Sequence, residues 1–556
     1  MPNKSPSRFK KESSGDFDAQ TTFVELGSKF LCKRWGSAGF LVLQRIKGMG
    51  SLKCTNKTLC VVFVCYDDIR GDTRLERSKL QQQTMNDGKE QQSRAFLVDA
   101  QKGMIHMKKS IYEEKSLTKL IFIFGIPSML SLMMEMLTGI VDTAFAGNLP
   151  EIGDYALSAM ALISPILAIF IAVQTLFAMS TGILIARYLN DAERQNTSYT
   201  TGVVMSIAVS MAVSAVCYLM LPWLLSALGA EGQIFLLAKQ YLQIQLLSNV
   251  LSSVGYTLTC CIRAFGFPKA EVKIITGAVA VNIISNYIFA FVFQMGLSGL
   301  AWGTFVSELV CAVGAIAFLV KKKRWLRKER KSAAVFFHSA WELFKIGIAQ
   351  TAMQVLGSCT GFVINARLLT LGSMLHVAAW NVVQRIYTFV LTPIIGLTQG
   401  VQNIISYFSG NGEQEKIRAV SRRTMIWCSA YGFISMLLMM SFGQTFSALF
   451  GGGHEIAAIA KTILMIVFLG FPFVGILYTD MTLLQVTGHE FASVLLILSR
   501  QVFFLIPMVY LIPALVMLGG FGISPITALL FCMPLADLLS VLFAVLVKRR
   551  IAAKIH

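Results

Sequence analysis

Five polar side chains follow one another at regular spacing along the otherwise apolar stretch 119–145. Intervals of three and four residues place them on one face of a helix, and they are Ser128, Ser131, Glu135, Thr138 and Asp142. A carboxylate at the centre of a bilayer costs at least ~2.5–3.5 kcal/mol, so this face must lie against protein or a watery cavity. Helix packing can explain the serines and the threonine. For Asp142 we predict a functional role in binding a proton or a small cation.

The sequence repeats itself at a spacing of 222 residues, and the repeat lies within apolar sequence. Gly125-Ile126 recurs as Gly347-Ile348, and Tyr256-Thr257 recurs as Tyr478-Thr479. One spacing that holds over so long a stretch indicates two homologous membrane halves joined head to tail. Duplicated halves are typical of secondary transporters, whose substrate site lies between the repeats.

The repeat singles out three positions that are polar in the first half and apolar in the second. In order, the pairs are Asp142 and Ile364, Asn282 and Phe504, and Asn286 and Met508. Packing alone gives no reason for a one-sided change at three places. We therefore predict ion coupling in the first half, by Asp142, Asn282, Asn286 and Glu135.

Several other stretches are polar on one side, which predicts a central cavity between the helices. Its expected lining residues are Thr138, Asn249, Tyr256, Gln350, Gln354, Asn381 and Arg385. Small polar residues also hold membrane helices together, so each stripe by itself is weak support. For Arg385 we favour structural pairing, with Glu308, Asp480 or Asp537, over substrate contact.

The composition is that of a polytopic membrane protein. Of 556 residues, 55% are hydrophobic and 14% are charged, and the mean hydropathy is +0.63. Twelve stretches are long enough to span a bilayer, and they are 119–145, 155–186, 198–221, 233–259, 271–293, 298–320, 342–366, 375–408, 424–442, 456–484, 491–512 and 524–547. We predict an all-α membrane protein with twelve transmembrane helices in two pseudo-symmetric six-helix lobes.

The positive charges lie in alternate loops between the predicted spans. The net charge is +19, and basic clusters occur at 321–324, 416–423 and 548–550. Because cytoplasmic loops of membrane proteins collect Lys and Arg, this pattern places both termini in the cytoplasm and does not indicate nucleic-acid binding. We expect a multi-pass protein of the cell membrane.

Motifs for enzymatic chemistry are missing from the sequence. It has no Walker A sequence, nucleophile elbow or HExxH motif. Its 11 cysteines include no CxxC pair. We expect no enzymatic activity, no metal site and no cofactor other than H⁺ or Na⁺ as a coupling ion.

Four regions are predicted along the chain. Residues 1–106 carry many charges and only short apolar runs, so we interpret them as a poorly structured extension that is not native to the transporter. The N-lobe is 107–320, a basic cytoplasmic linker is 321–341, and the C-lobe is 342–556.

The residues between about 115 and 550 resemble the multidrug and toxic compound extrusion (MATE) family. The resemblance rests on several short segments together: Gly125-Ile-Pro127, Gly139-Ile-Val-Asp142-Thr143, Leu157-Ser-Ala159, Arg263-Ala-Phe-Gly266 and Gly400-Val-Gln-Asn-Ile-Ile-Ser-Tyr407. It is closest to the bacterial branch that carries its coupling carboxylate in the first span.

The resemblance implies two V-shaped lobes that export organic cations in exchange for H⁺ or Na⁺. In that branch an aspartate of the first span couples to the ion, and Asp142 matches it. Pro127 matches the proline at which the first span bends. Asn282 matches an asparagine of the fifth span, but Asn286 stands where the branch usually has aspartate. With one carboxylate fewer, a proton site at Asp142 is favoured over a Na⁺ site.

We predict an antiporter, acting as a monomer, for small cationic amphiphilic drugs. The alternative is a lipid-linked saccharide flippase of the same superfamily. A flippase cavity would need several buried basic residues to hold a pyrophosphate, and Arg385 is the one that we place well inside a span. A membrane scaffold or receptor is a third interpretation, against which the duplicated halves and the one-sided acidic site both argue.

Overall fold

The computed structural model describes residues 112, 116–324, 332–449, 454–519 and 522–555. The extension predicted for 1–106 lies outside these residues. The first six long helices form the N-lobe: α6 (Leu117–Gly147), α7 (Gly153–Arg187), α8 (Ala192–Leu219), α10 (Gly232–Ala264), α11 (Pro268–Tyr287) and α12 (Gly296–Lys321). A short helix, α9 (Leu221–Ala227), precedes α10, and a π-helical turn, η1 (Ile288–Val292), extends α11.

The C-lobe repeats this order in six further helical segments. It begins with α13 (Ala333–Leu371), α14 (Met374–Gly410) and α15 (Gln414–Leu449). The next two segments are interrupted: α16 (His454–Val467), η2 (Phe468–Gly470) and α17 (Phe471–Val486), then α18 (Glu490–Leu498), η3 (Ser499–Leu505) and α19 (Ile506–Gly519). The last is α20 (Pro525–Ile555). The described residues contain no strand, and the predicted all-α fold with twelve long helical segments in two lobes is confirmed.

Eleven of the twelve segments in the described part of the chain are apolar enough to be recognised as membrane spans from composition and length. The exception is α10, which is long enough at 33 residues but polar along one side. Its polar residues are buried within the N-lobe, among them Ser248, Asn249, Ser253, Thr257 and Arg263. Because these side chains face other helices, their polarity is compatible with a membrane setting.

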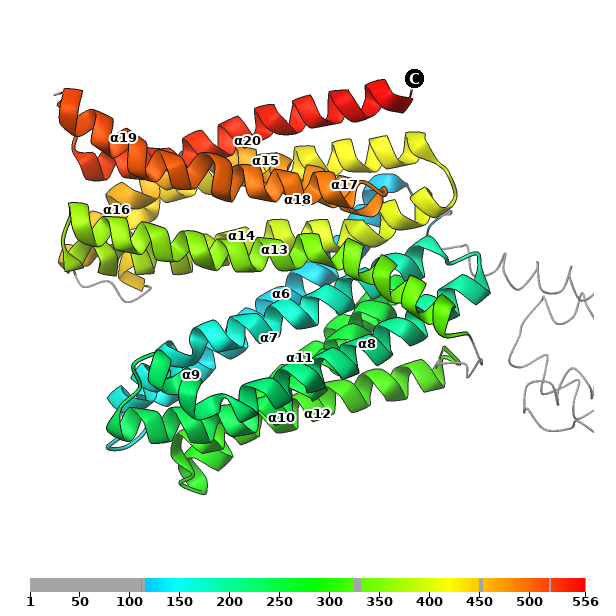
Figure 1. The fold of residues 1–556 in the computed structure, drawn as a ribbon, viewed down its shortest axis with the longest axis horizontal. Helices are drawn as coiled ribbons and strands as arrows, with labels where there is room; N and C mark the ends of the chain where they lie inside the picture. The colour runs from blue at the N-terminus through cyan, green and yellow to red at the C-terminus, as the bar shows by residue number, and fades with distance from the viewer. Residues whose placement is uncertain (1–111, 113–115, 325–331, 450–453, 520–521, 556) are drawn as a thin grey trace, which may run out of the picture. The chain divides into compact units, whose positions relative to one another are not determined.

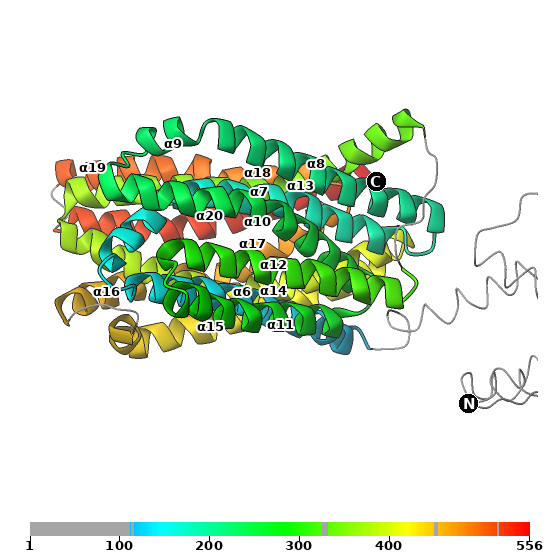
Figure 2. The same ribbon diagram turned by 90° about the horizontal axis from the view of Figure 1, so that it is seen from below.

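The helices run roughly along one common direction in both views of the ribbon (Figures 1 and 2). The two lobes lie closest at the end that carries the C-terminus and diverge toward the end that carries α9 and α19 (Figure 1). At the close end the Arg187 guanidinium donates a 2.9 Å hydrogen bond to the carbonyl oxygen of Val486. There the Tyr188 hydroxyl also donates to a Glu342 carboxylate oxygen at 2.9 Å.

Two glycines allow α14 of the C-lobe to pack directly on the backbone of α6. A Cβ atom on Gly400 would lie 2.6 Å from the carbonyl oxygen of Phe124, and one on Gly396 would lie 2.5 Å from the Cα of Met129. Small residues four apart let membrane helices approach closely, which raises van der Waals contact. This contact joins the lobes on the segment of α6 that contains Pro127.

We predict that Gly400→Ala lowers the stability of the protein by about 1–3 kcal/mol, because the added methyl group must push two backbones apart. Thermal unfolding of the purified protein in detergent measures this. Gly277→Ala on α11 is the matched control, since a Cβ there meets nothing within 4 Å. Equal unfolding temperatures for the Gly400 variant and the wild type would contradict the packing described here.

A candidate cation site beside a central cavity

Asp142 lies in a small cluster of side chains between α6, α11 and α12. The amide nitrogen of Asn286 donates to a carboxylate oxygen of Asp142 at 2.5 Å and to the side-chain oxygen of Asn282 at 3.1 Å. The amide nitrogen of Asn282 in turn lies 3.4 Å from the Ser307 hydroxyl. Both asparagines are almost fully buried. The structure therefore brings together three of the four residues predicted for ion coupling.

The local sequence explains how the cluster fits. Asn282 and Asn286 are four residues apart, so both side chains lie on the same face of α11. Gly303 on α12 faces them, and a side chain at that position would collide with the Asn286 amide oxygen. That oxygen is buried and has no hydrogen-bond donor among the described residues. An amide oxygen without a donor, beside a carboxylate, suits a site that also holds a proton or a cation.

Asp142 is not neutralised by a fixed positive charge. None of the ion pairs among the described residues includes it. Other buried carboxylates are paired: Glu271 with Arg263 at 3.2 Å, Asp537 with Arg500 at 2.5 Å and Asp480 with Lys548 at 2.7 Å. No group of three or more His, Cys, Asp or Glu side chains is placed to hold a metal ion within the described part of the chain. The Asp142 cluster thus offers one carboxylate and two amides.

The positions that correspond by the repeat have the opposite character in the C-lobe. Ile364 is 2% exposed and belongs to a large hydrophobic core, against which Phe504 and Met508 also pack. The corresponding positions therefore form a polar cluster in one lobe and apolar packing in the other, where Ile364 also lines the central cavity.

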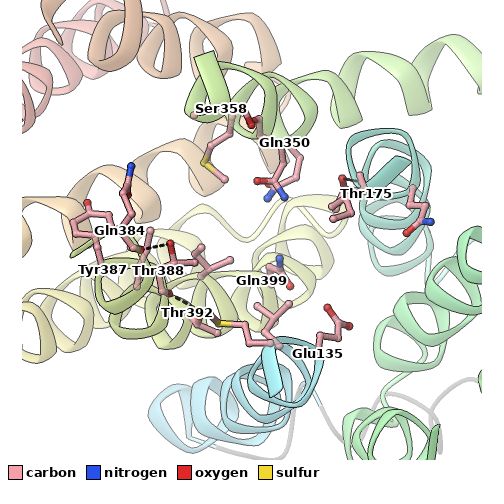
Figure 3. A pocket seen from close by; sticks show the side chains of 18 of the residues that line it. Glu135, Thr175, Gln350, Ser358, Gln384, Tyr387, Thr388, Thr392 and Gln399 are labelled. Atoms are coloured by element: carbon pink, nitrogen blue, oxygen red, sulfur yellow. Dashed lines mark hydrogen bonds between the residues drawn. The ribbon is translucent and has the colours of Figure 1, made fainter. Parts of the chain in front are cut away.

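A cavity of about 850 Å³ lies between the two lobes and is large enough for a drug-sized molecule. In Figure 3, Glu135 of α6 and Thr175 of α7 lie across from side chains of α13 and α14. The Thr392 hydroxyl of α14 lies 2.7 Å from the sulfur of Met136, so the lobes also meet at the cavity's edge. Aromatic residues are part of its lining, and they are Tyr256, Trp380, Tyr387 and Tyr478.

Most of the predicted cavity residues line this space. They are Thr138, Tyr256, Gln350, Gln354 and Asn381. Glu135, which we had grouped with the ion-coupling residues, also lines the cavity. It precedes Asp142 by two helical turns, or about 10 Å along the axis, and is not part of the hydrogen-bonded cluster.

Two predicted cavity residues lie elsewhere. Asn249 is buried behind the wall, where its amide oxygen accepts from Gln174 at 3.1 Å and its nitrogen donates to Ser214 at 2.9 Å. Arg385 is exposed and is not among the lining residues of α14. Of the acids suggested as its partners, Asp480 and Asp537 are paired with other basic residues. The sequence indicated polar helix faces but not which neighbour each face meets.

Two buried arginines were not among the predicted site residues. Arg500 lies on η3, within the predicted span 491–512, and lines the cavity. Arg263, which lies beyond the end of the predicted span 233–259, is the next-to-last residue of α10 and only 3% exposed. Our statement that Arg385 is the one basic residue well inside a span was therefore wrong. A signal was available, because Arg500 interrupts a long apolar run.

Pro127 lies inside α6, which continues through it without a break. The next residue, Ser128, is buried and donates to the carbonyl oxygen of Phe124 at 2.9 Å. Its hydroxyl accepts from the Arg263 guanidinium at 2.9 Å, and Arg263 is held by Glu271 on α11. The segment around Pro127 is thus attached to both α10 and α11.

Twelve long helices in two repeated lobes, with a cavity between them, define a polytopic membrane protein of the transporter class. The sequence model of the MatE family matches residues 127–288 and 351–511, one stretch in each lobe. The chain belongs to the MATE family of transporters, and it is not an enzyme.

Individual relatives and solved structures agree with this assignment. The chain is 26% identical over 444 residues to the multidrug export protein MepA of Staphylococcus aureus, covering 79% of this chain and 96% of that protein. Its fold is similar to that of a variant of the Vibrio cholerae MATE transporter VcmN, with a TM-score of 0.73, 21% identity and coverage of 79% and 98%. A MATE protein solved in complex with MaL6 gives a TM-score of 0.73 at 16% identity, with coverage of 80% and 98%.

We predict that Arg263→Gln destabilises the protein by about 3–5 kcal/mol, because it leaves Glu271 buried without its counter-charge. The double variant Arg263→Gln/Glu271→Gln should recover most of this loss, since it removes both charges together. Unfolding in detergent measures both effects. Equal stabilities for the single and the double variant would show that the ion pair does not couple the two residues.

Proposed function

We propose that this protein is a secondary active antiporter that exports cationic amphiphilic compounds in exchange for H⁺, with Na⁺ as the alternative coupling ion. The observation that carries the proposal is the Asp142 cluster, which is held by amides, lacks a fixed counter-ion among the described residues and has no counterpart in the C-lobe. The relative MepA is named as a multidrug export protein, which supports export as the direction of transport.

The chemistry follows from the cost of an unpaired charge in an apolar environment. A desolvated carboxylate is stabilised by a proton or by a bound cation, and these are alternatives. Asn286 donates to a carboxylate oxygen of Asp142, and such a hydrogen bond is stronger when the acid is ionised. When Asp142 is neutralised, this charge-assisted hydrogen bond weakens, and α6 is free to bend near Pro127. A proton and a drug cation then favour different conformations, which is the requirement for antiport.

A proton gradient is sufficient to drive such an exchange. Moving one charge across 100 mV corresponds to about 2.3 kcal/mol. The cavity wall supplies negative charge for binding a cationic substrate, since Glu135 and Glu308 of the N-lobe both line the cavity. Two carboxylates beside aromatic and apolar side chains suit an amphiphile that carries a positive charge.

The distribution of basic residues supports the orientation that we propose. Arg187 and Lys321 lie at the ends of α7 and α12, and Lys548 lies in the C-terminal part of α20; by the alternation of the helices along the chain, all three are on the same side. With that side in the cytoplasm, as the positive-inside rule requires, the lobes are in contact at the cytoplasmic end and diverge toward the outside. Because both lobes of one chain enclose the cavity, we propose a monomer in the cell membrane as the functional unit.

The lipid-linked saccharide flippase remains the less supported alternative. Arg263 and Arg500 add buried positive charge, contrary to our expectation, but each is neutralised by a carboxylate. A pyrophosphate would have to compete with both acids. No observation on the described residues favours that function over cation export.

We expect Asp142→Asn to abolish coupled efflux, so that its rate is at least tenfold lower than that of the wild type. The reason is that asparagine neither binds a proton nor attracts a cation. Ethidium efflux from membrane vesicles, with pH and Na⁺ gradients imposed separately, measures the effect. Asp154→Asn is the matched control, since Asp154 is exposed near the start of α7. Efflux at the wild-type rate by a well-expressed Asp142 variant would remove Asp142 from the mechanism.

We expect Asn286→Asp to increase the dependence of efflux on Na⁺. The substitution converts one carboxylate into two within a hydrogen-bonded cluster, and hard cations prefer several oxygen ligands. The same vesicle assay, with Na⁺ varied at fixed pH, provides the measurement. Asn148→Asp adds the same charge at the exposed end of α6 and serves as the control. An unchanged ion preference would show that Asn286 does not contribute to the coupling site.

A further inference from the structure

Tyr112 lies just before α6 and is buried between the two lobes, with only 3% of its surface exposed. Its ring stacks on that of Tyr407 of α14, with the ring centroids 4.4 Å apart and 19° between the ring planes. A second ring contact, at 5.2 Å, joins it to Phe124 of α6. Its hydroxyl donates to the carbonyl oxygen of Ala264 of α10 at 3.2 Å. One side chain that precedes the first long helix therefore contacts both lobes.

The hydrogen bond of Tyr112 satisfies a carbonyl group at the end of a helix. Ala264 is the last residue of α10 and is fully buried. The last four carbonyl oxygens of a helix have no partner within it, and a buried carbonyl without a donor is costly. The Tyr112 hydroxyl supplies that donor on the N-lobe side. On the C-lobe side Tyr407 is 1% exposed, so the ring of Tyr112 packs on a buried part of α14.

The repeat of 222 residues shows that this contact is one of a pair of bridges between the lobes. Ala264 corresponds to Val486, whose carbonyl oxygen accepts from the Arg187 guanidinium at 2.9 Å. Arg187 belongs to the N-lobe and Val486 to the C-lobe, so this bond joins the two. By the same spacing Arg187 corresponds to Ser409 of α14. A serine side chain is too short to match the reach of arginine, and the carbonyl of Ala264 is bound by Tyr112 instead.

The C-lobe does not use the corresponding position in this way. Tyr112 corresponds to Ala334, which is exposed near the start of α13. A six-helix lobe therefore does not require a buried side chain at this point before its first helix. The repeat isolates Tyr112 as a feature of one lobe, and that feature lies where the two lobes meet.

We propose that Tyr112 is a positioning residue that holds the lobes together at this end and leaves its place when this end opens. Its ring contacts the C-lobe and its hydroxyl contacts the N-lobe, so moving α10 away from α14 must break one of the two contacts. A transporter that gives access to each side in turn has to separate its lobes at this end in part of its cycle. Tyr112 then favours the form in which this end is closed. The inference goes beyond the proposed function, since it needs neither the coupling ion nor the substrate class.

Distances measured across the contact between the lobes test the proposal. Spin labels are attached at Lys269, near the start of α11, and at Glu415, near the start of α15, through a ketone-bearing amino acid that leaves the cysteines unchanged. Both positions are exposed, and they belong to different lobes. Double electron–electron resonance on the full chain in lipid nanodiscs gives the populations with short and long distances. The ratio of long to short distances reports how often this end is open.

Two variants separate the two contacts of Tyr112. Tyr112→Phe keeps the ring and removes only the hydrogen bond, and we expect it to raise the ratio about fivefold, the size of one neutral hydrogen bond. Tyr112→Ala also removes the ring contacts, and we expect it to raise the ratio about thirtyfold. Tyr155→Ala is the matched control, because Tyr155 is 46% exposed and lies near the start of α7, far from Arg187 at the other end of that helix. This control should leave the ratio at its wild-type value.

The order of the variants decides between a positioning role and a merely structural one. A ratio that rises from wild type to Tyr112→Phe to Tyr112→Ala, with no change in the control, supports the proposal. An unchanged ratio in both variants rejects it, even where the unfolding temperature falls, since Tyr112 would then stabilise the fold without holding the lobes together. If Tyr112→Ala does not fold, Tyr112→Phe decides alone, because it removes a single oxygen atom. Rejection leaves the proposed cation export intact.

Discussion

The arrangement of this protein depends on how each carboxylate in its apolar interior is neutralised. Three of them are matched by a basic side chain, as in the pairs Glu271 with Arg263, Asp537 with Arg500 and Asp480 with Lys548. Asp142 is stabilised by an amide donor instead. A fixed cation would keep a carboxylate ionised, whereas an amide stabilises it without cancelling its charge. Unlike these three acids, Asp142 has no basic partner among the described residues, and it is therefore the acid to which we assign ion coupling.

Duplication gave the two lobes the same helical framework, and substitution gave them different chemistry. The N-lobe carries a polar cluster where the C-lobe packs Ile364 into its hydrophobic core. The C-lobe carries Arg500 where the N-lobe has Ala278. The cavity is the place where both sets of differences meet, since its walls come from both lobes.

The attachment of α6 links the Asp142 cluster to the contact between the lobes. Around Pro127 this helix is packed against the glycines of α14 and bonded through Ser128 to Arg263. Two to four turns farther along, the same helix presents Glu135 to the cavity and Asp142 to α11. A helix that is held at one end and carries a chargeable group toward the other can respond to protonation by bending. In the proposed mechanism, the close-packed end is the fixed reference for that movement.

The sequence by itself determined the twelve spans, the two homologous lobes and the cluster of Asp142 with Asn282 and Asn286. Hydropathy, helical periodicity and the one-sided repeat can each be recognised in the sequence without knowledge of the fold. Which polar face meets which neighbour was decided only by the tertiary structure. It placed Arg385 outside the cavity, Arg500 in its wall and Asn249 behind it. Periodicity shows which residues share a face of a helix. In a bundle, however, a polar face can be buried against another helix or open to a cavity, and only the packing of all the helices distinguishes the two.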